Sequence, residues 1–212
     1  MSKKIIKYIL LGLAVGFFFY HSFYFENLSD RQQRQQQSEF DPVVYVDHFW
    51  QNLQEELHRA LAADQLIHLF RTDMAKAVQQ YGKTLGVSER HSYLVNGTGE
   101  VVKITDESLH VNLPSSSTQI SIATDFIFGN DIRDASGLVR VSDFPSTMEF
   151  NTISSEINKR ITTQVLPAIL DSVQVGDTLQ FVGATTVHET SPELDPLVVV
   201  PIRLVINPET TN

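Results

Sequence analysis

The sequence predicts an α+β protein with an N-terminal transmembrane helix, a helical segment, and a five-stranded barrel-like sheet plugged by one helix. Three observations lead to this prediction: one long apolar stretch, then apolar residues at three- and four-residue steps, then alternating apolar residues in short runs. The expected divisions are a membrane anchor (1–26), a polar spacer (27–39), a helical segment (40–90), the barrel (91–207) and a tail (208–212).

The anchor prediction rests on residues 5–25, "IIKYILLGLAVGFFFYHSFYF". At ~1.5 Å per residue, a helix of this length covers roughly 30 Å, which matches the hydrocarbon thickness of a bilayer. Lys3, Lys4 and Lys7 cluster at one end, so the N-terminus is expected in the cytoplasm and the remaining domain outside. The alternative is a cleaved signal peptide, although bulky residues occupy the position where cleavage needs small ones.

The composition excludes several functions. Lys3, Lys4 and Lys7 are three of the 16 Lys and Arg, so the rest of the chain carries 13 basic against 25 acidic side chains. Such an acidic domain repels nucleic-acid phosphates, and no nucleic-acid partner is expected. The chain has no cysteine, which excludes disulfides, thiolate metal sites, cysteine nucleophiles and a lipid-bearing cysteine.

The helical segment is expected to hold two helices. Asp41 is a candidate N-cap and is followed by proline at the first helical position. One apolar stripe then consists of Val43, Val46, Phe49, Trp50, Leu53 and Leu57. A second helix is expected from Asp64 to Gly82.

The alternating pattern predicts strands from residue 92 onward. A long strand over 92–105 contains Gly97 and Gly99, which often mark a bulge or bend. Further strands are expected over 109–114, 117–128, 176–186 and 197–206, and residues 137–144 are a shorter strand candidate. A helix over 151–170, capped by Asn151 or Thr152, is expected to kink or end at Pro167.

The order of these elements indicates an OB-fold, a five-stranded Greek-key barrel. A long bent strand and two more strands precede one helix, and two strands follow it. The helix over 152–170 is expected to plug one end of the barrel. An open α+β sheet with one packed helix is the alternative.

Four stretches stand out, in order along residues 40–205: "FDPVVYVDHFW", "LVNGTGEVV", "DIRDASGLVRVSDF" and "MEFNTISSEINKRITTQVLP". Together they resemble one bacterial family, predicted periplasmic lipoproteins with domain of unknown function 2291. The resemblance implies an extracytoplasmic, membrane-tethered, OB-like domain, often encoded beside components of sugar-uptake transporters. It implies no activity and no functional residues. Because the lipid-bearing cysteine is missing, the expected location is the bacterial inner membrane, with residues 5–25 as a single-pass anchor.

No arrangement of residues predicts catalysis. The sequence has no His-Glu-x-x-His, no Gly-x-Ser-x-Gly and no compact group of metal ligands. The glycine-rich stretch 96–100 runs into a strand instead of the helix that a phosphate loop needs. We expect neither metal, cofactor nor enzymatic activity.

The most site-like segment is "DFIFGNDIRDASG", residues 125–137. It holds Asn130, Arg133 and Asp134, and Arg133 is a candidate clamp for a carboxylate or a polyol. The other interpretation is an internal Arg–Asp pair that stabilises the loop. Asn158 is a further candidate, either for binding or for tying its helix to backbone.

The expected function is therefore that of a non-enzymatic, membrane-anchored, extracytoplasmic accessory or binding protein. Its expected partners are the membrane, through residues 5–25, and an envelope or sugar-transporter protein. The alternative is binding of a small polar ligand, such as a sugar, by the loop of residues 130–134. An envelope enzyme is a third and weaker hypothesis.

Overall fold

The computed structural model describes residues 40–114 and 118–207, and from Asp41 onward these form one compact unit. The predicted anchor (1–26), spacer (27–39) and tail (208–212) lie outside the described residues. Within the described part, no helix is long and apolar enough to cross a membrane. The elements are, in order, α3 (Pro42–Glu56), η1 (Leu57–Arg59), β1 (Leu61–Ala62), α4 (Ala63–Thr72), α5 (Met74–Tyr81), β2 (Arg90–Ile104), β3 (Ser108–Asn112), β4 (Gln119–Ala123), α6 (Asp131–Ser136), η2 (Val141–Asp143), α7 (Thr147–Arg160), η3 (Ile161–Val165), α8 (Pro167–Leu170), β5 (Thr178–His188) and β6 (Leu197–Asn207).

The predicted fold class is wrong in its sheet, which has six strands instead of the five of a barrel. Their order is β1-β2-β3-β4-β6-β5, and β2 also pairs with β5. The additional strand β1 comes from the segment predicted to be helical and runs parallel to β2, with Leu61 opposite Val95. Next to it, Asn96 Nδ2 donates a hydrogen bond to the Ala60 carbonyl at 2.7 Å. A two-residue strand has no periodicity to detect, and only its partner strand reveals it.

Several further segments differ from the prediction, and the strand predicted over 117–128 ends at Ala123 as β4. Residues 137–144, predicted to be a strand, contain the 3₁₀ turn η2 and no strand, and the preceding loop contains helix α6. The single helix predicted over 151–170 is three consecutive elements, α7, the π-helical turn η3 and α8. α7 begins earlier than predicted, because Ser146 is its cap and accepts a hydrogen bond from the Glu149 amide at 3.2 Å.

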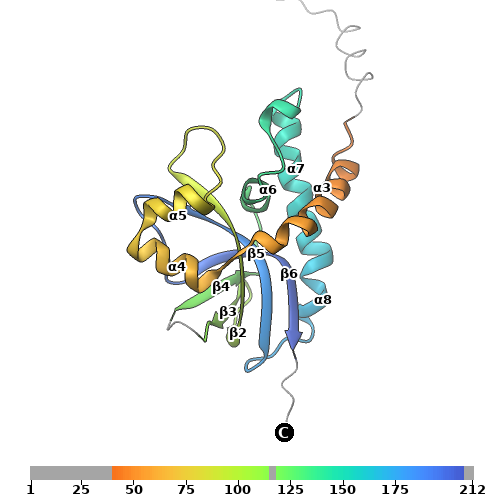
Figure 1. Ribbon diagram of the computed structural model, residues 1–212. Helices are drawn as coiled ribbons and strands as arrows, with labels where there is room; N and C mark the ends of the chain where they lie inside the picture. The colour runs from red at the N-terminus through yellow and green to blue at the C-terminus, as the bar shows by residue number, and fades with distance from the viewer. Residues whose placement is uncertain (1–39, 115–117, 208–212) are drawn as a thin grey trace, which may run out of the picture. The chain divides into compact units, whose positions relative to one another are not determined.

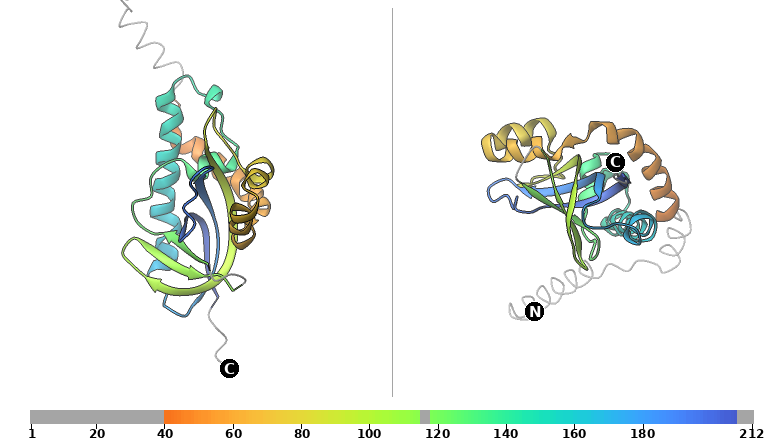
Figure 2. Two further views of the ribbon diagram at one scale, coloured as in Figure 1. Left: turned by 90° about the vertical axis from the view of Figure 1, so that its left-hand side faces the viewer. Right: turned by 90° about the horizontal axis from the view of Figure 1, so that it is seen from below.

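Strand β2 changes its partner partway along its length. Residues from Arg90 to Glu100 pair with β5, and those from Glu100 to Ile104 pair with β3. The change occurs beside Gly99, in agreement with the bend that the two glycines predict. Helices α4 and α5 lie at one side of the sheet, and α7, η3 and α8 lie at the other (Figures 1 and 2).

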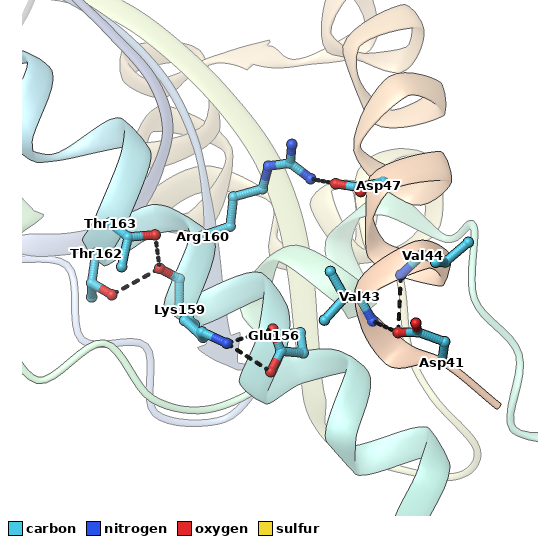
Figure 3. A network of polar contacts seen from close by, with 9 residues as sticks. All are labelled: Asp41, Val43, Val44, Asp47, Glu156, Lys159, Arg160, Thr162 and Thr163. Carbon is cyan, nitrogen blue, oxygen red and sulfur yellow. Dashed lines mark hydrogen bonds and ion pairs between the residues drawn. The ribbon is translucent and has the colours of Figure 1, made fainter. Parts of the chain in front are cut away.

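Helix α3 packs against α7 and holds it in place. Asp41 caps α3 as predicted, accepting hydrogen bonds from the Val43 and Val44 amides at 2.8 and 3.3 Å. From α7, Arg160 reaches Asp47 of α3 at 2.7 Å (Figure 3). Its guanidinium carbon also lies 5.3 Å from the centre of the Trp50 ring. These contacts fix the helix that carries the candidate site.

The buried phenol of Tyr93 makes stability sensitive to alkaline pH. Tyr93 is 1% exposed and packs edge-on against Phe70 at 5.1 Å. Burial first, and then the charge of Glu189, raises its pKa to about 12, whereas an unfolded chain has a tyrosine pKa of ~10. The contribution of the neutral phenol is complete below pH ~10 and is lost as the pH rises towards 12, because only the unfolded chain ionises in that range.

We therefore expect urea unfolding of the wild-type protein to show a loss of about 2 kcal/mol between pH 9.5 and 12 that Tyr93→Phe does not show. The difference between the two proteins cancels the titration of all other groups. Parallel stability curves for wild type and variant would contradict this expectation.

Candidate functional site

A cavity of about 600 Å³ lies between α7 and the loop that precedes α6. The loop contributes residues 127–130, and α7 with the start of η3 contributes a stripe of polar side chains, Asn151, Ser154, Ser155, Asn158 and Thr162. These positions recur at three- and four-residue steps, so they share one face of the helix. The buried isoleucines 153, 157 and 161 lie on another face and anchor the helix in the protein interior.

The structure brings two of the four predicted site residues to this cavity. Asn130 lies at the start of α6, and its carbonyl accepts a hydrogen bond from the Asp134 amide at 2.8 Å. Asn158 comes from α7, and its Nδ2 donates to the Gly129 carbonyl at 3.1 Å. Gly129 has a φ of +90°, a conformation in which side chains are strained. The Asn158 contact therefore fastens a sharp turn of the loop against α7.

The other two predicted residues do not line the cavity. Arg133 is only 2% exposed, and its Nε donates to Asp134 Oδ1 at 2.8 Å. Its Nη1 donates to the Phe150 carbonyl at 3.3 Å, and its guanidinium carbon lies 3.8 Å from the centre of the Phe150 ring. Arg133 and Asp134 thus form an internal pair that joins α6 to α7, as the second interpretation of this segment describes.

Ser154 is the feature of the cavity that sequence reasoning missed. Its side chain is 5% exposed, and its Oγ has no hydrogen-bond partner among the described residues. Buried hydroxyls nearly always have a partner, because an unpaired one costs about 1–3 kcal/mol. Less than 1 Å² of this oxygen is accessible, so a bound solute can provide the missing partner only where the surrounding side chains move to expose it. The sequence does show polar residues at helical spacing along α7. Whether such a stripe lines a cavity or faces open solvent depends on which face of α7 packs on the core.

The cavity is nearly free of charge. Among the described residues that line it, Lys159 is the one ionic side chain, and it pairs with Glu156 at 3.2 Å. Nowhere among residues 40–114 and 118–207 do three or more potential metal ligands converge. Amide and hydroxyl groups without net charge suit a neutral, hydrogen-bonding solute better than an ion.

A larger cavity of about 800 Å³ lies between η1, α4 and the strands β2, β5 and β6. Its lining includes Asp64 of α4 and Arg203 of β6. No buried polar atom without a partner lines it among the described residues, in contrast to the cavity at Ser154. The smaller cavity is therefore the stronger candidate for a binding site.

Comparison with known proteins shows which family the chain matches. The model of the family described as predicted periplasmic lipoprotein (DUF2291) matches residues 13–205, which confirms the resemblance found in the sequence. No curated protein matches the chain. A crystal structure of an OB-fold protein from Thermotoga maritima is similar, with a TM-score of 0.73 and 26% identity over 80% of this chain and 100% of that one. The OB-fold-like description of the domain is thus supported.

The same family description corrects the predicted location. The sequence predicted a single-pass protein of the inner membrane, with a cytoplasmic N-terminus and a signal-anchor helix over residues 5–25. The matching family is described as periplasmic and lipoprotein, a class attached to the membrane by lipid instead of by a spanning helix.

Proposed function

The chain belongs to the DUF2291 family of predicted periplasmic lipoproteins, and from this premise we propose that it is a non-enzymatic binding protein for a small neutral polar solute. The solute occupies the cavity between α7 and the loop of residues 127–130. This proposal keeps Asn130 and Asn158 as binding residues and leaves Arg133 and Asp134 with a structural role.

The observation that carries this proposal is the row of hydrogen-bonding side chains that α7 presents to the cavity, among them Ser154, whose buried hydroxyl has no partner among the described residues. A volume of about 600 Å³ falls within the ~300–1,000 Å³ common for small-molecule sites. The carboxamides of Asn130, Asn151 and Asn158 offer both donors and acceptors. Such a set can bind several hydroxyl groups of one solute without recruiting an ion.

The direct test is calorimetric titration of the full chain with neutral sugars and polyols, and in parallel with inorganic phosphate and amino acids. We expect heat of binding and a raised melting temperature only with the neutral, hydroxyl-rich compounds, since ligands that bind the folded state stabilise it. Binding restricted to the charged compounds would contradict the proposal.

Ser154→Ala separates a binding role from a structural one. Removing an unpaired buried hydroxyl is expected to raise the free energy of unfolding by about 1 kcal/mol, because alanine needs no partner and favours helix. The same change is expected to weaken solute binding about fivefold. Chemical denaturation and titration of the variant measure the two effects.

Thr152→Ala is the matched control on the same helix, because Thr152 does not line the cavity and its hydroxyl already donates to the Met148 carbonyl at 2.9 Å. It is expected to leave affinity unchanged. A Ser154→Ala protein that binds as the wild type does would remove Ser154 from the site.

The proposed partner is a protein of a solute-uptake system in the cell envelope. The support is the family's periplasmic description together with a cavity that suits a transportable solute. Gentle cross-linking in intact cells, followed by capture of the full chain, is expected to recover a transporter component. Recovery of no envelope protein would reject the partner and leave the binding function standing.

A further inference from the structure

Two phenylalanines beside the cavity are exposed without an evident packing role. Phe126 is 66% exposed and Phe128 is 73% exposed. Phe128 lines the cavity. Their ring centres are 6.3 Å apart, with the planes tilted by 33°. Water-exposed aromatic rings gain little from folding, so their position calls for another reason.

The backbone of Phe126 is strained. Its φ is +50°, and it is the one non-glycine residue with positive φ among those that the structure describes. A bulky residue in this left-handed region costs roughly 1–2 kcal/mol, and such strain tends to persist at ligand clamps. Here the strain is not offset by burial of the ring. The Phe126 amide donates to Asp125 Oδ1 at 2.8 Å, which holds the residue in this conformation.

The same short loop is fixed at its other end. Gly129 makes the sharp turn, and Asn158 of α7 binds its carbonyl. The two aromatic rings therefore stand on a segment held at both ends, beside a wall of amides and hydroxyls. An aromatic surface next to neutral hydrogen-bonding groups is an amphipathic site, apolar on one side and polar on the other.

We propose that Phe126 and Phe128 form a stacking platform for the apolar face of a pyranose ring, so that the solute is a cyclic sugar. This inference rests on the proposed binding function. The axial C–H groups of a pyranose carry small positive partial charges and meet the negative face of an aromatic ring. The hydroxyl groups at its edge then point to the carboxamides of Asn130, Asn151 and Asn158.

This chemistry distinguishes a cyclic sugar from two other solutes. An open-chain polyol offers the same hydroxyl groups but no flat C–H face. An amino acid or a sugar phosphate needs charged partners, and Lys159, the one ionic side chain among the described lining residues, is paired with Glu156. Aromatic contacts of this kind contribute about 0.5–1.5 kcal/mol, so losing one ring costs up to about tenfold in affinity.

The test titrates the full chain with matched pairs: D-glucose and glucitol, D-galactose and galactitol, D-mannose and mannitol. For a pyranose that binds, Phe128→Ala is expected to lower affinity about tenfold and Phe128→Tyr to preserve it. Phe126→Asn is expected to lower affinity about threefold without loss of fold, because asparagine tolerates the left-handed conformation. Saturation-transfer NMR is expected to show the strongest signal on the protons of one pyranose face.

The outcomes separate the two proposals. One outcome rejects the stacking platform: sugars and alditols bind the wild type equally well, and Phe128→Ala changes their affinities by the same factor or not at all. The proposed binding of a neutral solute still stands in that case. If none of the six compounds binds the wild-type chain, both the platform and the neutral-solute function are rejected. Discrimination between ring and open chain that disappears in Phe128→Ala supports the platform.

Discussion

Arg133→Ala is expected to lower the free energy of unfolding by about 3–5 kcal/mol, the range for breaking a buried ion pair from one side. Arg133 is 2% exposed, and its guanidinium donates hydrogen bonds to Asp134 Oδ1 and to the Phe150 carbonyl. Its removal leaves a partly buried carboxylate without its cation and opens a cavity beside the Phe150 ring. Urea denaturation of the purified full chain measures the change.

Arg160→Ala is the matched control for this prediction. Arg160 also pairs with an aspartate, Asp47 at 2.7 Å, but the two side chains are 22% and 54% exposed. Water and salt screen such a pair, so its loss is expected to cost less than about 1 kcal/mol. Equal losses of unfolding free energy in the two variants would show that burial does not determine how much Arg133 contributes to stability.

Gly99→Ala is expected to destabilise the protein by about 3 kcal/mol, the upper part of the usual cost of overfilling a packed interior. A Cβ at this position would lie 2.7 Å from Val111 Cγ1 and closer still to the Asn112 carbonyl oxygen. Val111 and Asn112 both belong to β3, the strand that pairs with β2 from Glu100 onward. Because the obstruction is backbone, no side-chain rotation can relieve it.

Gly86→Ala provides the comparison. Gly86 has a φ of +69° and nothing within 4 Å of the added Cβ, so only backbone strain of about 1 kcal/mol is expected. Thermal unfolding of both variants checks the pair. A Gly99→Ala protein no less stable than Gly86→Ala would mean that β2 and β3 can separate at the bend without loss.

Features of the fold that depend only on residues close together in the chain could be predicted from the sequence. Asp41 followed by proline specified the start of α3, since the cap needs only its own side chain and the amides two and three residues on. The second predicted helix, over 64–82, is instead two helices, α4 and α5. They divide at Asp73, which caps α5 through the Lys76 amide at 3.0 Å. An aspartate within a helical pattern is a local signal for such a break.

The candidate site was predictable in part. Asn130 and Asn158 were predicted as candidate binding residues, and the structure brings them to one cavity. For Arg133 the sequence allowed two interpretations, a clamp for a ligand and an internal pair with Asp134, and the structure shows the pair. Ser154 was missed, since a serine in a helix gives no sign that its hydroxyl lacks a partner.

By itself, the sequence determined the α+β composition, the cap of α3, the long strand with its glycine bend and the family, because each depends on residues close together in the chain. The tertiary structure alone decided that β1 pairs with β2, which of its two possible roles Arg133 takes, and that Phe128 lines the cavity beside the polar face of α7. These three features depend on contacts between segments that are distant in the chain. Packing and burial select one arrangement of such segments, and no local sequence pattern encodes that choice.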